Sequence, residues 1–112
     1  MQTMILLLCT FPDAQQARQI ATAMVERQLA ACVNLLPGVQ SIYRWQGQVE
    51  QSTEVLAIFK TASVLYPALA EAVAAAHPYE LPELVALEPS AVADAYLAWV
   101  LAAAPPAVSS TP

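Results

Sequence analysis

Residues 31–60 read ACVNLLPGVQSIYRWQGQVEQSTEVLAIFK, and they carry the strongest signal for the fold of this chain. Two runs of strand-forming residues, Ala31–Tyr43 and Val49–Lys60, flank a glycine-containing turn at Trp45–Gln48. Each run is about twice the length of an ordinary strand. Pro37-Gly38 interrupts the first run, which predicts a bulge or a bend. The pattern predicts a long β-hairpin that pairs with a neighbour, because an unpaired projecting edge promotes aggregation.

The second arm of this hairpin has two alternating sets of side chains, and neither set is wholly polar. The half nearer the turn is polar to mixed, whereas Leu56 and Ile58, in the other half, suit a core. Alternation therefore predicts the strand clearly and its buried face less clearly.

Upstream of the hairpin, the sequence predicts a strand followed by a helix. Thr3–Thr10 is apolar without alternation, as in a central strand covered on both faces. Asp13 with Gln16 three residues later resembles a capping box and predicts a helix from Asp13 to about Gln28. Its apolar face consists of Ala17, Ile20, Ala21, Met24 and Val25.

Downstream of the hairpin, the sequence predicts two further helices and one short strand. Ser63 is positioned to cap a helix that His77-Pro78 ends, and residues 84–88 form a short strand. Ser90 is positioned to cap a last helix that runs to about Ala103. The apolar positions of this last helix are Ala93, Tyr96, Leu97, Val100, Leu101 and Ala104.

The predicted order is β-α-β-β-α-β with a C-terminal helix. This order is typical of an α+β, ferredoxin-like domain with one antiparallel sheet. A chain of 112 residues makes one domain, which we assign to residues 1–104. Residues 105–112 form a Pro- and Ser-rich tail that we expect to be disordered.

The composition and charge of the chain argue against several classes of protein function. Nine acidic and four basic residues give a formal net charge of −5, which argues against a nucleic-acid partner because phosphates require a basic stripe. Hydrophobic residues at 58 % and charged residues at 12 % exclude intrinsic disorder and favour an oligomer, since so few charges leave apolar surface uncovered. The apolar runs Met4–Cys9 and Ala95–Ala104 are too short to cross a bilayer, so we expect a cytoplasmic protein with no membrane partner.

Specific motifs then occur in one order along the chain. They are CT.PD (9–13), LAACVN (29–34), PG..SIY.W.G (37–47), KT (60–61), HPYE.PE (77–83) and YL.W (96–99). In this order and spacing they resemble the CutA family, the divalent-cation tolerance proteins, over about residues 4–100. The resemblance implies a ferredoxin-like homotrimer with hairpins paired between subunits, a cytoplasmic location, and a response to copper and other divalent cations. Residues 88–94 lack the glycine that many members carry before the last helix.

Five side chains are candidate metal ligands. A thiolate at Cys32 suits Cu(I) or another soft ion. The alternative is that Cys32 is a small buried hydrophobic residue in a strand, which is equally common. His77, Glu80 and Glu83 share a proline-stiffened loop, and imidazole with carboxylates suits Cu(II) or another divalent cation; the alternative role of His77 is to cap a helix. Cys9 is the second choice, because the helix that starts beside it can lower the pKa of its thiol. These ligands can come from different subunits.

Another six side chains are candidates for a cleft between subunits. One alternative function is a PII-like trimeric signalling module that binds a small anionic metabolite through Lys60 and Arg44. Another is a structural trimer without a ligand. We expect no enzyme, because no nucleophile–base pair can be named. The six cleft candidates are Tyr43, Arg44, Trp45, Glu54, Lys60 and Tyr79.

Overall fold

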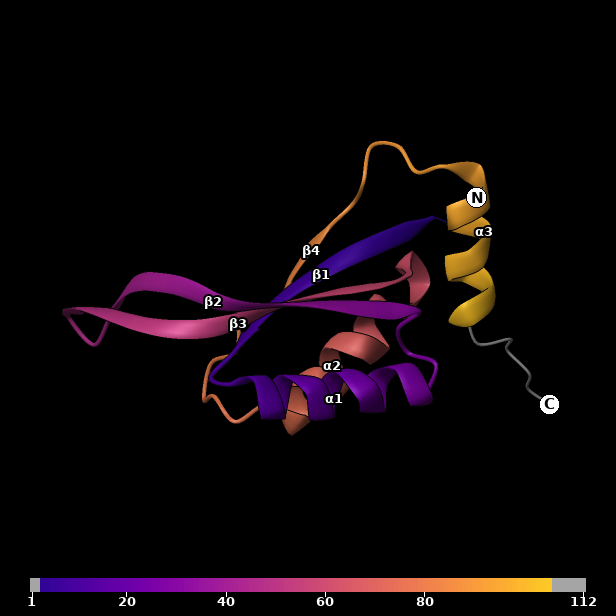
Figure 1. The fold of residues 1–112 in the computed structure, drawn as a ribbon. Helices are drawn as coiled ribbons and strands as arrows, with labels where there is room; N and C mark the ends of the chain where they lie inside the picture. The colour runs from indigo at the N-terminus through magenta and orange to yellow at the C-terminus, as the bar shows by residue number, and fades with distance from the viewer. Residues whose placement is uncertain (1–2, 106–112) are drawn as a thin grey trace.

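The computed structural model describes residues 3–105, which form one four-stranded antiparallel sheet and three α-helices (Figure 1). The strand order is β2-β3-β1-β4, and every neighbouring pair is antiparallel. The α+β, ferredoxin-like prediction is confirmed; the predicted tail lies, apart from Pro105, outside the described residues. The bounds are β1 (Met4–Phe11), α1 (Ala14–Glu26), β2 (Cys32–Trp45), β3 (Gln48–Ala62), α2 (Tyr66–Ala76), β4 (Val85–Leu87) and α3 (Asp94–Ala103).

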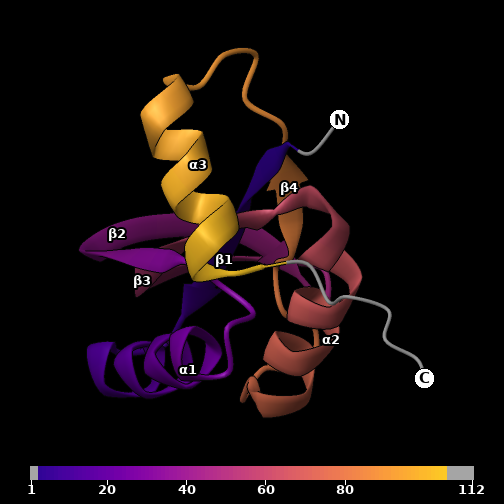
Figure 2. The ribbon, with the colours of Figure 1, turned by 90° about the vertical axis from the view of Figure 1, so that its right-hand side faces the viewer.

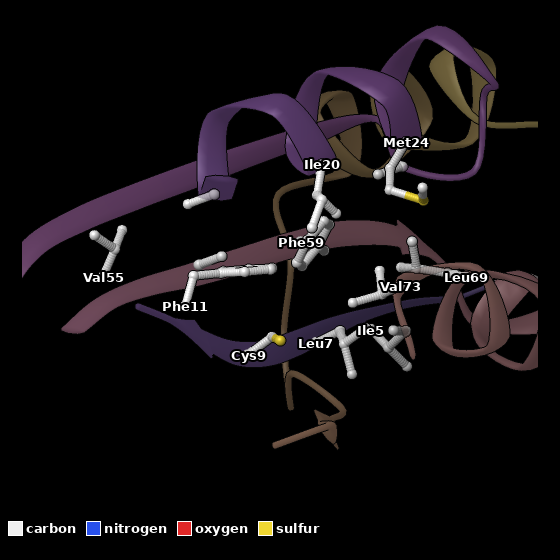
Figure 3. Close-up of a cluster of buried hydrophobic side chains, with 13 residues drawn as sticks. Ile5, Leu7, Cys9, Phe11, Ile20, Met24, Val55, Phe59, Leu69 and Val73 are labelled. Carbon is white, nitrogen blue, oxygen red and sulfur yellow. The ribbon is translucent and has the colours of Figure 1, made fainter. Parts of the chain in front are cut away.

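One face of the sheet packs against α1 and α2 and forms the main core (Figure 3). Alternate residues of β1 and β3 point into this core, so Val55 and Phe59 are buried while Leu56 and Ile58 lie half-buried on the opposite face. The prediction that Leu56 and Ile58 belong to the core is therefore wrong, because the alternate set of β3 side chains fills it. The main buried side chains are Ile5, Leu7, Cys9, Phe11, Ile20, Met24, Val55, Phe59, Leu69 and Val73.

The opposite face of the sheet is covered at one end only. Figure 2 shows α3 on the side of the sheet away from α1 and α2, where Val100 and Ala104 pack on Met4 in a second, smaller core. Further along this face, Leu36 and Leu87 remain 42 % and 47 % exposed. The prediction that the first strand is central is confirmed, but it is not covered equally on both faces.

The hairpin of β2 and β3 projects far beyond the sheet (Figure 1). Residues 39–45 of β2 pair with residues 48–54 of β3, and β1 reaches no further along β3 than Val55. The predicted bulge is confirmed, because Pro37 and Gly38 together oppose Val55. At the tip, Gln46 and Gly47 both have positive φ, 52° and 80°, as a two-residue type I′ turn requires.

The first helix begins as predicted. The Asp13 side chain accepts a hydrogen bond of 2.8 Å from the backbone N–H of Gln16. The Gln16 amide donates to the other carboxylate oxygen of Asp13, so the pair differs from a full capping box, in which that side chain reaches the backbone. The helix ends at Glu26 and not at Gln28, which has positive φ.

The other two helices begin later than predicted. Ser63 starts a short 3-10 helix and hydrogen-bonds the hydroxyl of Thr3, so it does not cap α2. Pro67 occupies the first turn of α2, where a missing N–H costs little. Ser90 does not cap α3, which starts at Asp94; the residue at its N-cap is Ala93, which has a non-helical backbone (φ −58°, ψ 135°) and no capping side chain. No helix within residues 3–105 combines the length and apolar character that crossing a bilayer requires.

Candidate functional site

A broad groove of about 1090 Å³ lies between the projecting hairpin and the loop that follows α2. Side chains from β2 and β3 form one wall, and residues 78–83 form the other. No lysine, arginine or histidine is among its lining residues, so its charged lining is wholly acidic. The charged and aromatic side chains that line it are Glu50, Glu54, Glu80, Glu83, Tyr43, Trp45 and Tyr79.

A hydrogen bond between Tyr79 and Glu54 joins the two walls of the groove. The Tyr79 hydroxyl donates to Oε2 of Glu54 over 2.5 Å, and Glu54 is only 8 % exposed. Burial and this bond to a carboxylate together raise the pKa of Tyr79 above its usual range. Tyr79 therefore remains a hydrogen-bond donor at neutral pH and holds the loop against the hairpin.

His77 fixes the start of the same loop. Its Nε2 lies 2.8 Å from the carbonyl oxygen of Thr10, and its Nδ1 accepts from the backbone N–H of Tyr79 over 3.0 Å. Because a carbonyl can only accept, the ring carries its proton on Nε2. The ring also stacks on Phe11, with centroids 4.6 Å apart. Both ring nitrogens thus have protein partners, and a metal ion would have to displace one of them.

Cys9 lies beneath the groove in the main core. It is fully buried, and burial followed by the carboxylates of Glu83 and Glu54 raises its pKa to about 12. The expected effect of the nearby helix start, a lowered pKa, is therefore outweighed. Cys9 is a protonated thiol at neutral pH, which is a poor metal ligand.

Cys32 lies in a separate cluster near the start of β2. Its sulfur is 3.6 Å from the hydroxyl of Tyr96, and Lys60 is its direct partner on β3. The Lys60 ammonium lies 5.7 Å from the centroid of the Tyr96 ring. The hydrogen bond with Cys32, and then burial, raise the pKa of Tyr96.

The structure thus divides the predicted site residues between two places. Tyr43, Trp45, Glu54, Tyr79, Glu80 and Glu83 line the groove, whereas Cys32 and Lys60 do not. Arg44 does not line it either, although its neighbours Tyr43 and Trp45 do. Within residues 3–105, no three His, Cys, Asp or Glu side chains form a group that could hold a metal ion.

The sequence-based prediction missed Glu50, Ser41 and Ser52, which also line the groove. Ser41 is the direct partner of Ser52, and Tyr43 is the direct partner of Glu50. Glu50 and Ser52 share the face of Glu54 because side chains alternate along β3, and the two-against-one bulge at Pro37-Gly38 sets Ser41 of β2 on the same face.

Comparisons with known proteins agree with this architecture. The sequence profile of the CutA1 divalent ion tolerance protein family matches residues 5–103. Divalent-cation tolerance protein CutA of Thermus thermophilus is 50 % identical over 93 residues, which are 83 % of this chain and 90 % of that protein. The crystal structure of CutA from Xylella fastidiosa superposes with a TM-score of 0.89 at 38 % identity, covering 91 % of this chain and 98 % of that one.

Length differs among the relatives. Protein CutA of Mus musculus is 50 % identical over 91 residues, which are 81 % of this chain but 51 % of that protein. The chain therefore spans about half the length of its mammalian relatives and most of the length of its bacterial ones. With the profile matched across nearly the whole chain and the fold shared, the chain belongs to the CutA1 divalent ion tolerance protein family.

Proposed function

We propose that this chain acts in divalent-cation tolerance by binding copper or another divalent cation directly, and that it is not an enzyme. The observation that carries the proposal is the groove in which every charged lining side chain is a carboxylate. The names of relatives at 40–50 % identity, divalent-cation tolerance proteins, support the same role.

The proposed ligands are completed by a second subunit. The candidate set of Cys32, His77, Glu80 and Glu83, with Cys9 as second choice, does not fit a complete site within one chain, since the described residues hold no such group. Glu80 and Glu83 are exposed at the groove and free to coordinate, and Cys32 is the more accessible soft ligand. His77 contributes only by exchanging one of its hydrogen bonds for the metal.

The proposed assembly is a homotrimer. The projecting hairpin leaves backbone edges beyond β1 that a neighbouring subunit can pair with. The open sheet face offers Leu36 and Leu87, and α3 offers Trp99, each between 42 % and 48 % exposed, for burial between subunits. The acidic chain suits neither a nucleic acid nor an anionic membrane surface as a partner.

We propose a cytoplasmic location for this chain. The names of family members give different locations. The relative from Arabidopsis thaliana is called chloroplastic, and a solved structure from Archaeoglobus fulgidus is called periplasmic. Fractionation of the native host, with an antibody against this chain, tests the location directly.

Isothermal titration with Cu(II), Zn(II) and Mg(II) tests metal binding. We expect Cu(II) and Zn(II) to bind more tightly than Mg(II), and Glu83→Gln to weaken Zn(II) about tenfold, which is about 1.4 kcal/mol. Cys32→Ser should weaken Cu(I) more than Cu(II), because a thiolate is the softer ligand. Glu71→Gln, an exposed carboxylate on α2 outside the groove, is the matched control and should change nothing. Equal Zn(II) affinities of Glu83→Gln and the parent protein would show that the groove is not part of the metal site.

Light scattering at micromolar concentration tests the assembly. The expected mass is three times the 12.0 kDa of the chain. Leu36→Glu should release monomer, whereas Val25→Glu should not, because Val25 is similarly exposed but lies on α1. A monomeric parent protein would contradict the trimer.

A further inference from the structure

His77 joins the loop after α2 to the end of β1 through three contacts. Its Nε2–H donates to the carbonyl oxygen of Thr10 over 2.8 Å, and its ring stacks on Phe11. Its Nδ1 accepts from the backbone N–H of Tyr79 over 3.0 Å. The ring is only 8 % exposed, so these bonds satisfy both polar atoms of a buried imidazole and favour this closed arrangement of the loop.

The two ring nitrogens of His77 differ in what they can offer to a metal ion. Nε2 carries the proton, whereas Nδ1 has a lone pair, and a metal ion coordinates a lone pair. In the closed loop, the Tyr79 N–H already occupies the lone pair of Nδ1. A metal ion at Nδ1 therefore competes with this backbone group, while Nε2 can keep its bond to Thr10.

Tyr79 is held at its other end as well. Its hydroxyl donates to Oε2 of the buried Glu54 over 2.5 Å. Glu54 lies at the root of the projecting hairpin, one residue beyond Val55, the last residue of β3 that pairs with β1. Pro78, with its fixed φ, links His77 to Tyr79. The Tyr79 backbone therefore has little freedom to turn away from His77 while its hydroxyl stays on Glu54, and both bonds of Tyr79 stabilise the same closed state.

We propose that residues 77–79 form a latch that blocks the metal-coordinating nitrogen of His77, so that a divalent cation binds Nδ1 only when the latch opens. This inference rests on the proposed metal binding and adds its regulation. Closing the latch lowers the metal affinity, and metal binding favours the open latch by the same factor. The apparent affinity falls in proportion to the fraction of chains in which Nδ1 is free.

NMR of the imidazole nitrogens tests which atom the metal takes. His77 is the only histidine of the chain, so the untagged protein gives the signals of one ring. Without metal, we expect a ring protonated at Nε2. Saturating Zn(II) should shift the Nδ1 signal and leave Nε2 protonated. It should also speed hydrogen exchange of the Tyr79 amide at least tenfold, because that N–H loses its acceptor.

Calorimetric titration of Tyr79→Phe with Zn(II) separates a latch from an ordinary ligand. The change removes the hydroxyl that holds Tyr79 on Glu54 and removes none of the proposed metal ligands. Zn(II) should therefore bind about tenfold more tightly to Tyr79→Phe than to the parent protein. Tyr66→Phe, which removes a hydroxyl from α2 outside the groove, is the matched control and should leave the affinity unchanged.

The outcomes distinguish the latch from the metal binding on which it rests. Equal or weaker Zn(II) binding by Tyr79→Phe would overturn the latch, and so would coordination through Nε2. Zn(II) binding that shifts neither ring nitrogen would overturn the latch but leave Glu80 and Glu83 as proposed ligands. No Zn(II) binding by either protein would overturn both proposals, whereas binding by Tyr79→Phe alone would support the latch.

Discussion

Replacing Tyr79 by Phe tests the contact that joins the loop to the hairpin. The change removes only the hydroxyl that donates to Glu54 over 2.5 Å. A hydrogen bond to a charged group contributes about 1.5–3 kcal/mol, and its loss leaves a nearly buried carboxylate without a donor. We therefore expect the free energy of unfolding to fall by about 2 kcal/mol.

Denaturant unfolding at equal protein concentrations measures this change, because the proposed assembly makes apparent stability depend on concentration. Tyr43→Phe is the matched control. Its hydroxyl lies 3.4 Å from that of Ser52 at an exposed position, so its removal should alter the free energy of unfolding by less than about 0.5 kcal/mol. A double-mutant cycle with Glu54→Gln assigns the loss to this pair.

The dependence on pH provides a second test of the same contact. The folded chain raises the pKa of Tyr79, first through burial and then through Glu54, above the value near 10 that an unfolded tyrosine has. The folded state therefore holds this proton longer, and its contribution to stability is present below about pH 10 and lost as the pH rises further. The difference between the parent and Tyr79→Phe should narrow above about pH 10. A loss under 0.5 kcal/mol at pH 7, or a difference that widens with pH, would refute the reasoning.

Three further predictions concern other parts of the chain. Thr61→Val should raise the free energy of unfolding by about 1 kcal/mol, because the Thr61 hydroxyl is buried with no partner among the described residues; a decrease would reveal a missing donor or acceptor. At the hairpin tip, Gln46→Asn should raise the free energy of unfolding and Gly47→Ala should lower it, each by up to about 1 kcal/mol in the same assay, because both positions have positive φ. Changes of the opposite sign would contradict the type I′ turn. A disulfide reagent at pH 8 should modify Cys32 quickly and Cys9 only after unfolding, since burial raises the pKa of Cys9 to about 12; two equally fast thiols would contradict its burial.

The elements that could be predicted from sequence are those whose signals act over a few residues. Asp13 caps α1 because its side chain reaches the N–H three positions on, and Pro37-Gly38 forms the bulge because glycine accepts φ of 77°. The turn at Gln46-Gly47 and the length of both arms follow from the same local preferences. The family motifs, carried by residues 9–99, also belong to this level.

Predictions from local sequence patterns were wrong where two residues or two faces fitted the same pattern equally well. Ser90 and Ser63 both have the chemistry of a helix cap, but Ser63 bonds Thr3, and the chain after Ser90 does not become helical until Asp94. In the half of β3 that pairs with β1, both alternating sets contain large apolar side chains, so packing against α1 and α2 decided that Val55 and Phe59 enter the core and that Leu56 and Ile58 do not. Capping and alternation offer candidates, and tertiary contacts select among them.

The candidate site was decided by tertiary structure alone. Glu54 and Tyr79 are 25 positions apart, and they meet because β3 extends past the end of β1 toward the loop after α2. The same geometry places His77 against Thr10 and leaves Cys32 beside Tyr96, so residues that the sequence offered as one ligand set belong to two clusters. Side-chain chemistry is encoded residue by residue, but convergence in space depends on strand register and on where each strand ends.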